Sequence, residues 1–439
     1  MRELLQQREF ARLLAGRVVT TAGDSFYAVA SMWLVQELTH STFYTGLAGT
    51  LSFLPYLLQM FTGPIVDRWP IRRTLVVTQG LQGLLVLTIP LLALAGRPPV
   101  WAVLALIPLL ALVGQFGEPA EQASMPRILD REHLVKANSA FTFAYQGTNV
   151  LFRALAGLLV VAIGAPSLYA VDALSFALAA LIFSRLRVPP AQPAAGEAGE
   201  GPGPVPGPGE GGSLLRRYFD DLREGLRLVL GSVVGRMTLI FVLSNFAVAA
   251  MWSVLPQHAA THGGAGVYGA LLSAMAAGVI LGALLAPRLE GWPLATAVSL
   301  VTFLGGLAWL TAAFTFSAPL LVFAFGVGWV PTGVVNALVM GGLQRIVPAS
   351  MMGRVAAAIT SLVSLAMPVG SFVGGVLGQV EGPSLVVAGT AVTGLLLALY
   401  WVGDPILRKL PATRQLNQSH LRLRTGGSQG APEAPAAGG

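Results

Sequence analysis

Long apolar segments, separated by short polar ones, recur along the whole chain. They cover residues 13–37, 45–66, 74–95, 100–116, 140–163, 167–183, 237–255, 267–286, 294–314, 318–340, 355–380 and 384–402. A helix needs about 20 mostly apolar residues to cross the hydrocarbon core of a bilayer. The fourth and sixth segments are short, and we expect their helices to extend to Glu121 and Arg185. The pattern predicts an all-α membrane protein with twelve transmembrane helices; the ten-residue alternating segments of a membrane barrel do not occur.

The basic residues fall mainly between alternate pairs of these segments. Of 27 lysines and arginines, all but Arg17, Arg97 and Arg153 lie on the side that carries both termini. Such an excess marks the cytoplasmic side, so we expect both termini in the cytoplasm and an even number of spans. The polar N-terminal segment has no small-residue cleavage site, so we expect no removable signal peptide. We predict a multi-pass protein of a bacterial inner membrane.

A proline- and glycine-rich segment divides the chain into two halves. We predict a six-helix bundle at 1–187, a cytoplasmic linker at 188–235, a second six-helix bundle at 236–410 and a disordered cytoplasmic tail at 411–439. Within the linker, residues 214–230 place leucines and arginines at helical spacing, which predicts an amphipathic helix on the membrane surface. The rest of the linker is too rich in proline and glycine to bury a core.

The two halves carry an internal repeat. Residues 126–129 read Pro-Arg-Ile-Leu and residues 344–347 read Gln-Arg-Ile-Val, at an offset of 218. Lys136 matches Arg354 and Gly157 matches Gly375 at the same offset, and Pro-Ser-Leu recurs at 166–168 and 383–385. A repeat of six spans places the halves in parallel orientation, an arrangement that supports alternating access by rocking.

Composition excludes several classes of protein. Only 11% of the 439 residues are charged and 54% are hydrophobic, whereas soluble proteins carry about 25% charged residues. The net charge of +7 lies in loops between apolar runs, so we expect no nucleic-acid partner. The chain has no cysteine, and its five histidines are scattered; His258 and His262 are four residues apart beside two glycines, which we interpret as a helix exit. We therefore predict no metal, no cofactor and no enzyme, since a nucleophile–base set and a phosphate-binding glycine loop are also missing.

The loop after the second segment carries the most specific motif. Gly63 is followed by Asp67, Arg68, Arg72 and Arg73. This set resembles the signature loop between helices 2 and 3 of the major facilitator superfamily. Glycine allows a neighbouring helix to approach closely, and Asp67 can face a helix N-terminus or an arginine across the halves. We expect these residues to form a gate; residues 282–288 resemble a decayed second copy in which Ala286 replaces the acid.

Other positions resemble the twelve-span drug:proton antiporter branch of this superfamily, which includes macrolide-efflux proteins. They are Gly23-Asp24, Pro55, Glu118-Pro-Ala120 leading to Pro126-Arg127, and Gly353-Arg354-Val355. The resemblance covers all but the linker and tail. One position departs from it: antiporters of this type carry a Gly-Pro pair in helix five, whereas Arg153 stands at the proline position here. The direction of transport is therefore left open.

Ionisable residues within membrane spans are costly and mark functional sites. Asp24 lies mid-span, where burial favours a protonatable acid, so Asp24, Asp172 and Arg153 are our proton-coupling candidates. Arg153 and Asp172 can equally form a structural ion pair. We expect Glu118 and Glu121 to pair with Arg127 or Arg131, and we count Glu118, Glu121, Arg127, Arg345 and Arg354 as cytoplasmic gate candidates.

Polar and aromatic residues within the spans are candidates for lining a cavity, although tryptophan also serves as an interfacial anchor. They are Trp33, Gln146, Asn149, Asn245, Trp252, Trp329 and Asn336.

The leading hypothesis is a secondary transporter that exports amphipathic small molecules such as drugs and is driven by protons. The alternatives are uptake, or lipid or metabolite translocation on the same fold, and a non-transporting membrane sensor. We expect a small-molecule substrate, protons and the lipid bilayer as partners. The fold needs no second subunit, so we expect a monomer.

Overall fold

The computed structural model describes residues 6–55, 69–96, 98–189 and 232–422. These residues are almost entirely helical, as the apolar pattern predicts. The first half contains α2 (Arg8–Thr39), α3 (Thr42–Phe53), α5 (Ile71–Leu94), α6 (Val100–Gly114), α7 (Gly117–Ile128), α8 (Arg131–Ile163) and α9 (Ala165–Ser184). The second half contains α11 (Val233–Ala260), α12 (Ala265–Leu289), α13 (Leu294–Phe314), α14 (Ala318–Ile346), α15 (Ala349–Glu381) and α16 (Pro383–Gly403).

Eleven helical segments within the described residues are long and apolar enough to cross a membrane. The second predicted span, 45–66, lies only partly within the described residues, where α3 forms its beginning. Several helices are longer than their apolar segments: α8 begins at Arg131 and α15 at Ala349. A helix satisfies its own backbone hydrogen bonds and can therefore continue into water beyond the apolar stretch that predicts it.

The predicted repeat is confirmed by the positions at which equivalent helices begin and end. Both α8 and α15 have 33 residues and begin 218 positions apart, and Gly164 and Gly382 follow them with positive φ angles of 78° and 91°. The span Val100–Ile128, formed by α6 and α7, likewise matches Ala318–Ile346 at this offset. The two halves are therefore two copies of one helical unit, as the recurring motifs indicated.

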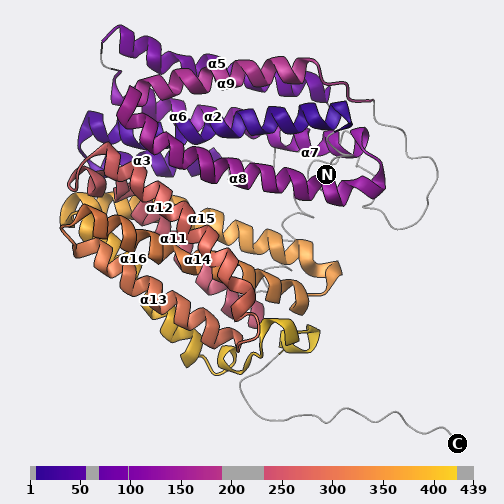
Figure 1. Ribbon diagram of the computed structural model, residues 1–439, viewed down its shortest axis with the longest axis vertical. Helices are drawn as coiled ribbons and strands as arrows, with labels where there is room; N and C mark the ends of the chain where they lie inside the picture. Colours follow the sequence, from indigo (N-terminus) through magenta and orange to yellow (C-terminus); the bar gives the residue numbers. More distant parts are fainter. Residues whose placement is uncertain (1–5, 56–68, 97, 190–231, 423–439) are drawn as a thin grey trace, which may run out of the picture.

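The helices of the two halves converge at one end of the molecule and diverge toward the other (Figure 1). We call the end where α2 begins and α16 ends the terminal end, and the end near Thr39 and Glu381 the far end. In the described residues, the hydrogen bonds between the halves lie toward the far end. They join Gln36 to Gln257, Ser41 to Gln379, Thr42 to the Gly375 carbonyl, Thr45 to the Ser253 carbonyl, Thr50 to the Pro368 carbonyl and Ser371 to the Gly46 carbonyl.

Two glycine pairs bring the halves into backbone contact. A Cβ atom added to Gly375 would lie 2.7 Å from the Gly46 Cα, and one added to Gly157 would lie 2.1 Å from the Gly269 Cα. Gly46 and Gly269 are each the fifth residue of their helix, and Gly157 and Gly375 each lie six residues before the end of theirs. The contacts of α3 with α15 and of α12 with α8 are thus equivalent, and both require glycine.

Glycines also bring α12 and α14 together within the second half. A Cβ on Gly282 would lie 2.0 Å from the Val330 carbonyl oxygen, and one on Gly278 would lie 2.1 Å from that of Gly326. Gly282 belongs to the decayed motif copy. Its close approach to a neighbouring helix is the role that the motif's glycine was expected to have.

The start of the predicted tail is ordered against the second half. Residues Thr413–Gln415 and Gln418–Arg422 form short 3-10 turns, and the side chain of Leu416 is buried near Met237 and Gly342. This corrects the prediction of disorder for residues 411–422, because an apolar residue in the polar tail finds a buried site. Residues 423–439 lie outside the described part, as do the amphipathic segment 214–230 and most of the linker.

Asp404 joins the end of α16 to the start of α11. Its Oδ1 accepts hydrogen bonds of 2.9 Å from the N–H groups of Ile406 and Leu407, and its Oδ2 pairs with Arg236. Burial of Asp404 alone would raise its pKa, but the two N–H groups and the Arg236 guanidinium outweigh it and lower the pKa below its ordinary value.

We expect Gly375→Val to force α3 and α15 apart, at a cost of about 1–3 kcal/mol for overpacking. Because the chain has no native cysteine, Ser41→Cys with Gln379→Cys provides a cross-linking reporter for the far end. Gly375→Val should lower the yield with a short bis-maleimide, whereas Gly389→Val, which meets nothing within 4 Å, should not. Equal yields in both variants would contradict the close contact.

We expect Asp404→Asn to lower thermal stability at about pH 7 by about 1 kcal/mol, since the charged form makes the stabilising contacts. The pKa of Asp404 is lowered on folding, so its stabilisation is present above the unfolded pKa and is lost as the pH falls through the folded one. The difference from wild type in thermal unfolding should therefore be full at neutral pH and shrink steadily as the pH falls below about 4. The exposed Glu290, 4.0 Å from Arg345, provides the control in Glu290→Gln. A difference that persists in acid would argue against the ionic contribution.

Candidate functional site

A buried ion pair lies in the first half near the terminal end. Arg17 on α2 contacts Glu121 on α7 at 3.0 Å and Glu118 at 3.9 Å, with 14% of the Arg17 side chain and 3% of the Glu121 side chain exposed. The Arg17 guanidinium also lies over the Tyr145 ring of α8, 4.5 Å from its centroid. One cation therefore holds three helices of this half together.

This pair corrects the sequence interpretation. Glu121 was expected to pair with Arg127 or Arg131, but its partner is Arg17; the side chain of Arg131 lies outside the described ones. Sequence reasoning noted Arg17 only as a basic residue inside the first span. Seven residues separate Arg17 from Asp24, so both lie on one face of α2, and this spacing was the signal that could have found Arg17.

Asp24 lies near the middle of α2, with its surface exposed. It is within electrostatic range of Arg17 on its own helix and of Arg153 on α8. Arg153 is also within range of Tyr268 on α12 of the other half. Asp24 and Arg153 are therefore brought together at the boundary between the halves, where the helices diverge toward the terminal end.

Asp172 on α9 lies behind Asp24 and is fully buried. Its Oδ1 accepts a hydrogen bond of 3.2 Å from Ser175, and its Oδ2 has no partner within the described structure. A Cβ on Gly23 would lie 2.3 Å from that Oδ1, so glycine is what lets α2 pack on this acid. An ionised carboxylate here would lack a compensating cation.

The predicted ion pair between Arg153 and Asp172 is not formed. Among the described residues, neither side chain has an ion-pair partner within 4.0 Å, and the charged residue near Asp172 is Asp24. Arg153 and Asp172 lie well inside α8 and α9, on either side of the turn at Gly164, but their side chains leave these helices in different directions. Arg153 faces the second half and Asp172 faces α2.

The predicted gate is only partly visible. Gly63, Asp67 and Arg68 lie outside the described residues, whereas Arg72 and Arg73 are exposed in the first turn of α5. Arg345 contacts Glu290 at 4.0 Å and the Arg414 carbonyl at 3.3 Å, both within the second half. Arg127 is half-buried, and Arg354 is exposed near the start of α15. Their gating role stays a prediction.

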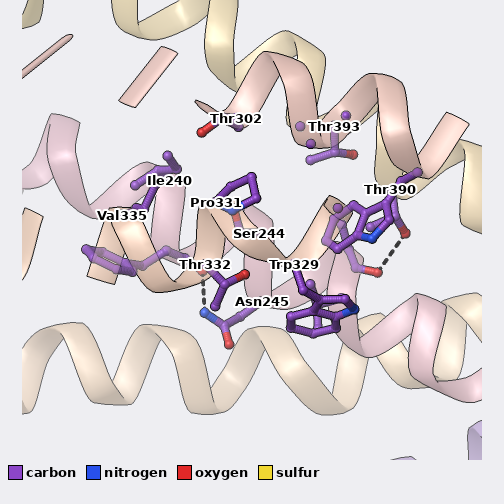
Figure 2. Close-up of a pocket in the computed structure, with 18 of the residues that line it drawn as sticks. Ile240, Ser244, Asn245, Thr302, Trp329, Pro331, Thr332, Val335, Thr390 and Thr393 are labelled. Atoms are coloured by element: carbon purple, nitrogen blue, oxygen red, sulfur yellow. Dashed lines mark hydrogen bonds between the residues drawn. The ribbon is translucent and has the colours of Figure 1, made fainter. Parts of the chain in front are cut away.

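A cavity of about 170 Å³ lies inside the second half between α11, α13, α14 and α16. Figure 2 shows its side chains around Pro331, with Thr302 and Thr393 on one side and Asn245 and Trp329 on the other. Asn245 donates a hydrogen bond of 2.8 Å to the Phe241 carbonyl. The lining side chains are uncharged. The charged residues near α2 (Arg17, Asp24, Arg153 and Asp172) therefore belong to the first half, whereas this neutral cavity belongs to the second.

The cavity candidates from the sequence are divided between three places. Asn245, Trp329 and Asn336 line the neutral cavity, and Trp252 packs edge-on against Trp329, with ring centroids 6.4 Å apart. Trp33 stacks on Tyr268 of the other half at 5.6 Å. Asn149 accepts a hydrogen bond of 3.3 Å from Ser25, and Gln146 is exposed on α8. Sequence reasoning did not single out Thr302 or Trp309, since one threonine or tryptophan in a span is common.

His258 and His262 hold helix ends together. The Nε2 atom of His258 is 3.2 Å from the Ala312 carbonyl, and that of His262 is 3.0 Å from the Thr315 carbonyl. They therefore tie the end of α11 to the end of α13. The described residues contain no group of three or more potential metal ligands.

The chain matches known transporters over most of its length. The model of the Major Facilitator Superfamily matches residues 13–371. The multidrug efflux pump Tap of Mycobacterium tuberculosis (strain ATCC 25618 / H37Rv) is 27% identical over 418 residues, which cover 92% of this chain and 94% of that protein. Tap of Mycolicibacterium fortuitum is 26% identical over 411 residues, 91% of this chain and 95% of that protein.

Solved structures share the fold. A bacterial homologue of the human lysosomal transporter Spinster, inward-facing and unoccupied, has a TM-score of 0.65 at 14% identity, covering 93% of this chain and 97% of that chain. An inward-facing bacterial homologue of the iron transporter ferroportin has a TM-score of 0.64 at 17% identity, covering 91% and 98%. At these identities the likeness is one of fold alone.

We expect Arg17→Met to destabilise the protein by about 3–5 kcal/mol, because it leaves Glu121 buried without a cation. The double variant Arg17→Met with Glu121→Leu should recover much of this loss in thermal unfolding. The pair of Arg12 and Glu9, at 2.6 Å, is the control because its side chains are less buried (35% and 25% exposed), and its removal should cost about 1 kcal/mol or less. Additive losses for Arg17 and Glu121 would show that the two residues are not coupled.

Proposed function

The chain belongs to the major facilitator superfamily, and on this premise we propose that it is a proton-coupled exporter of amphipathic small molecules. It is a multi-pass membrane transport protein, not an enzyme. We place it in a bacterial inner membrane, with both termini in the cytoplasm, on the excess of basic residues at the terminal end. The efflux pumps among its relatives favour export over the alternatives of uptake, lipid translocation or sensing.

The observation that carries the proposal is the position of Asp24. It is an exposed acid at mid-span, at the boundary between two halves that are closed at the far end and diverge toward the terminal end. Arg17 and Arg153 lie within electrostatic range and Asp172 lies behind it. An acid in this position can bind a proton from one side and release it on the other after the halves rock.

Transport would proceed by alternating access: the terminal end of the protein closes while the far end opens. In the proposed cycle, substrate and Asp24 would be reached from the terminal end in this conformation, and the basic residues assign that end to the cytoplasm. Closure there and opening at the far end would break the hydrogen bonds and glycine contacts between the halves. Each proton moving down a membrane potential supplies about 2.3 kcal/mol per 100 mV, which can drive the uphill movement of the substrate.

The first test is export of fluorescent drugs from cells that produce the protein. We expect Asp24→Asn, or a protonophore with the wild type, to reduce export to the level of cells without the protein. Glu37→Gln is the matched control, since Glu37 is an exposed acid near the far end of the same helix. It should export as the wild type does.

The alternatives give different results. Energy-dependent accumulation in place of export would favour uptake and overturn the proposed direction. The absence of flux for a broad panel, in cells and in inverted vesicles, would overturn drug export. Export that survives both Asp24→Asn and the protonophore would separate transport from proton coupling and overturn the role of Asp24.

A further inference from the structure

The cavity of the second half is formed within one bundle and is partly open. Its walls come from α11, α13, α14 and α16, so it lies beside the boundary between the halves and not across it. Its volume of about 170 Å³ is similar to that of an apolar cavity of about 150 Å³ that holds benzene. It therefore has room for one six-membered ring.

Proline and glycine produce this space. Pro331 lies in the middle of α14, where it removes one backbone N–H and prevents ideal helix packing. The ring of Pro331 fills the place of a side chain at Gly305, whose added Cβ would lie 2.4 Å from it. Beside this contact, a Cβ on Gly394 would have no neighbour closer than 3.8 Å. The helices α13 and α14 are thus in contact at Gly305 and Pro331, whereas space remains beside Gly394 of α16.

Two buried donors at this cavity lack an acceptor in the described structure. The Trp329 indole N–H and the Thr302 hydroxyl have no hydrogen-bond partner, although these residues are only 6% and 8% exposed. By contrast, the indole N–H of Trp309 donates to the Phe325 carbonyl at 3.3 Å. A buried donor without an acceptor costs about 1–3 kcal/mol. An acceptor on a bound molecule would remove this cost.

The walls also define the chemistry of the ligand. Trp309, Trp329 and Phe241 provide aromatic surface, and no lining side chain is ionisable. A charged group would be desolvated here without a counter-charge. The cavity therefore fits an uncharged ring that carries an oxygen acceptor, such as an ester or ketone carbonyl.

We propose that this cavity is a substrate subsite that receives the uncharged, acceptor-bearing ring of the transported molecule. The proposal rests on the proposed function and names the substrate class: an amphipathic cation whose charge faces Asp24. Asp24 is near the middle of α2 and Asn245 near the middle of α11, so the acid and the subsite lie at similar depth in the membrane. Charge and ring are then bound by different halves of the protein.

Two cationic probes distinguish burial of a ring in this subsite from its hydrogen bond to an oxygen acceptor. Rhodamine 6G is a cation whose phenyl ring carries an ethyl ester, whereas tetraphenylphosphonium is a cation whose phenyl rings carry no acceptor. Their Kd values would be measured on the purified full chain in lipid nanodiscs, by fluorescence anisotropy and by radioligand binding. Export of both would be measured in parallel in cells.

Gly394→Leu fills the cavity and should raise the Kd of both probes roughly tenfold or more, by loss of ring burial. Gly389→Leu is the matched control on the same helix, at an exposed position where an added Cβ meets nothing within 4 Å. It should leave both Kd values unchanged. Equal affinities in the two variants would overturn the subsite.

Thr302→Val should raise the Kd of rhodamine 6G roughly threefold to tenfold, the effect of one hydrogen bond, and leave that of tetraphenylphosphonium unchanged. Without ligand, the thermal stability of this variant should equal or exceed that of the wild type, because a buried unpaired hydroxyl is removed. A purely structural threonine would lower the unliganded stability and affect both probes alike, which would overturn its role as a donor.

The two proposals fail in different ways. Export of rhodamine 6G that is unaffected by Gly394→Leu would keep the exporter and overturn the subsite. Binding that depends on Gly394 and Thr302, without protonophore-sensitive export, would keep the subsite and overturn the exporter. The absence of both binding and export for both probes would overturn both proposals.

Discussion

The contact between two backbones, where glycine replaces side chains, is the constraint on which the arrangement of the halves depends. Gly46 meets Gly375, and Gly157 meets Gly269, at equivalent positions of the repeated unit. Any side chain at these positions would enter the backbone of the opposite helix, so the far end closes only with glycine. Because the two contacts are related by the repeat, they lie on opposite sides of the pseudo-two-fold axis between the halves, and the halves can rock against each other there.

The bonds around these glycines are suited to a contact that has to open. The hydrogen bonds between the halves at the far end come from hydroxyl and amide groups, such as those of Thr42 and Ser41. Each neutral hydrogen bond contributes only about 0.5–1.5 kcal/mol net, and water can replace it when the halves separate. The buried ion pair of Arg17 and Glu121 lies instead within one half, where separation of its members, at a cost of several kcal/mol, is not required.

The sequence predicted the fold well because the hydrophobic pattern and the repeat can both be read from the order of residues along the chain. The offset of 218, read from short motifs and Gly157, recurs in the bounds of α8 and α15. Which charges meet in space could not be predicted in the same way. Glu121 pairs with Arg17, 104 residues away, and Asp172 lies against Gly23 and not against Arg153. The rotation and packing of the helices determine these contacts. The neutral cavity likewise depends on the level at which Pro331 of α14 packs against Gly305 of α13, which composition does not reveal.

The two halves share one fold but differ in chemistry. The first half places Asp24, Asp172, Arg17 and Arg153 close to the middle of α2, whereas the second half contains a cavity lined by threonines, asparagines and aromatic rings. If both halves carried buried acids, each would have to find a counter-charge in both conformations, at a cost that rises with burial. In the proposed mechanism, confining these mid-span charges to the first half leaves the second half free to bind substrate by shape and by single hydrogen bonds. Such binding tolerates varied molecules, since an uncharged ring of suitable size is required but no fixed pattern of charges. Under the proposed function, the repeat supplies the symmetry needed for rocking, and the divergence of its two copies would separate energy coupling in the first half from recognition in the second.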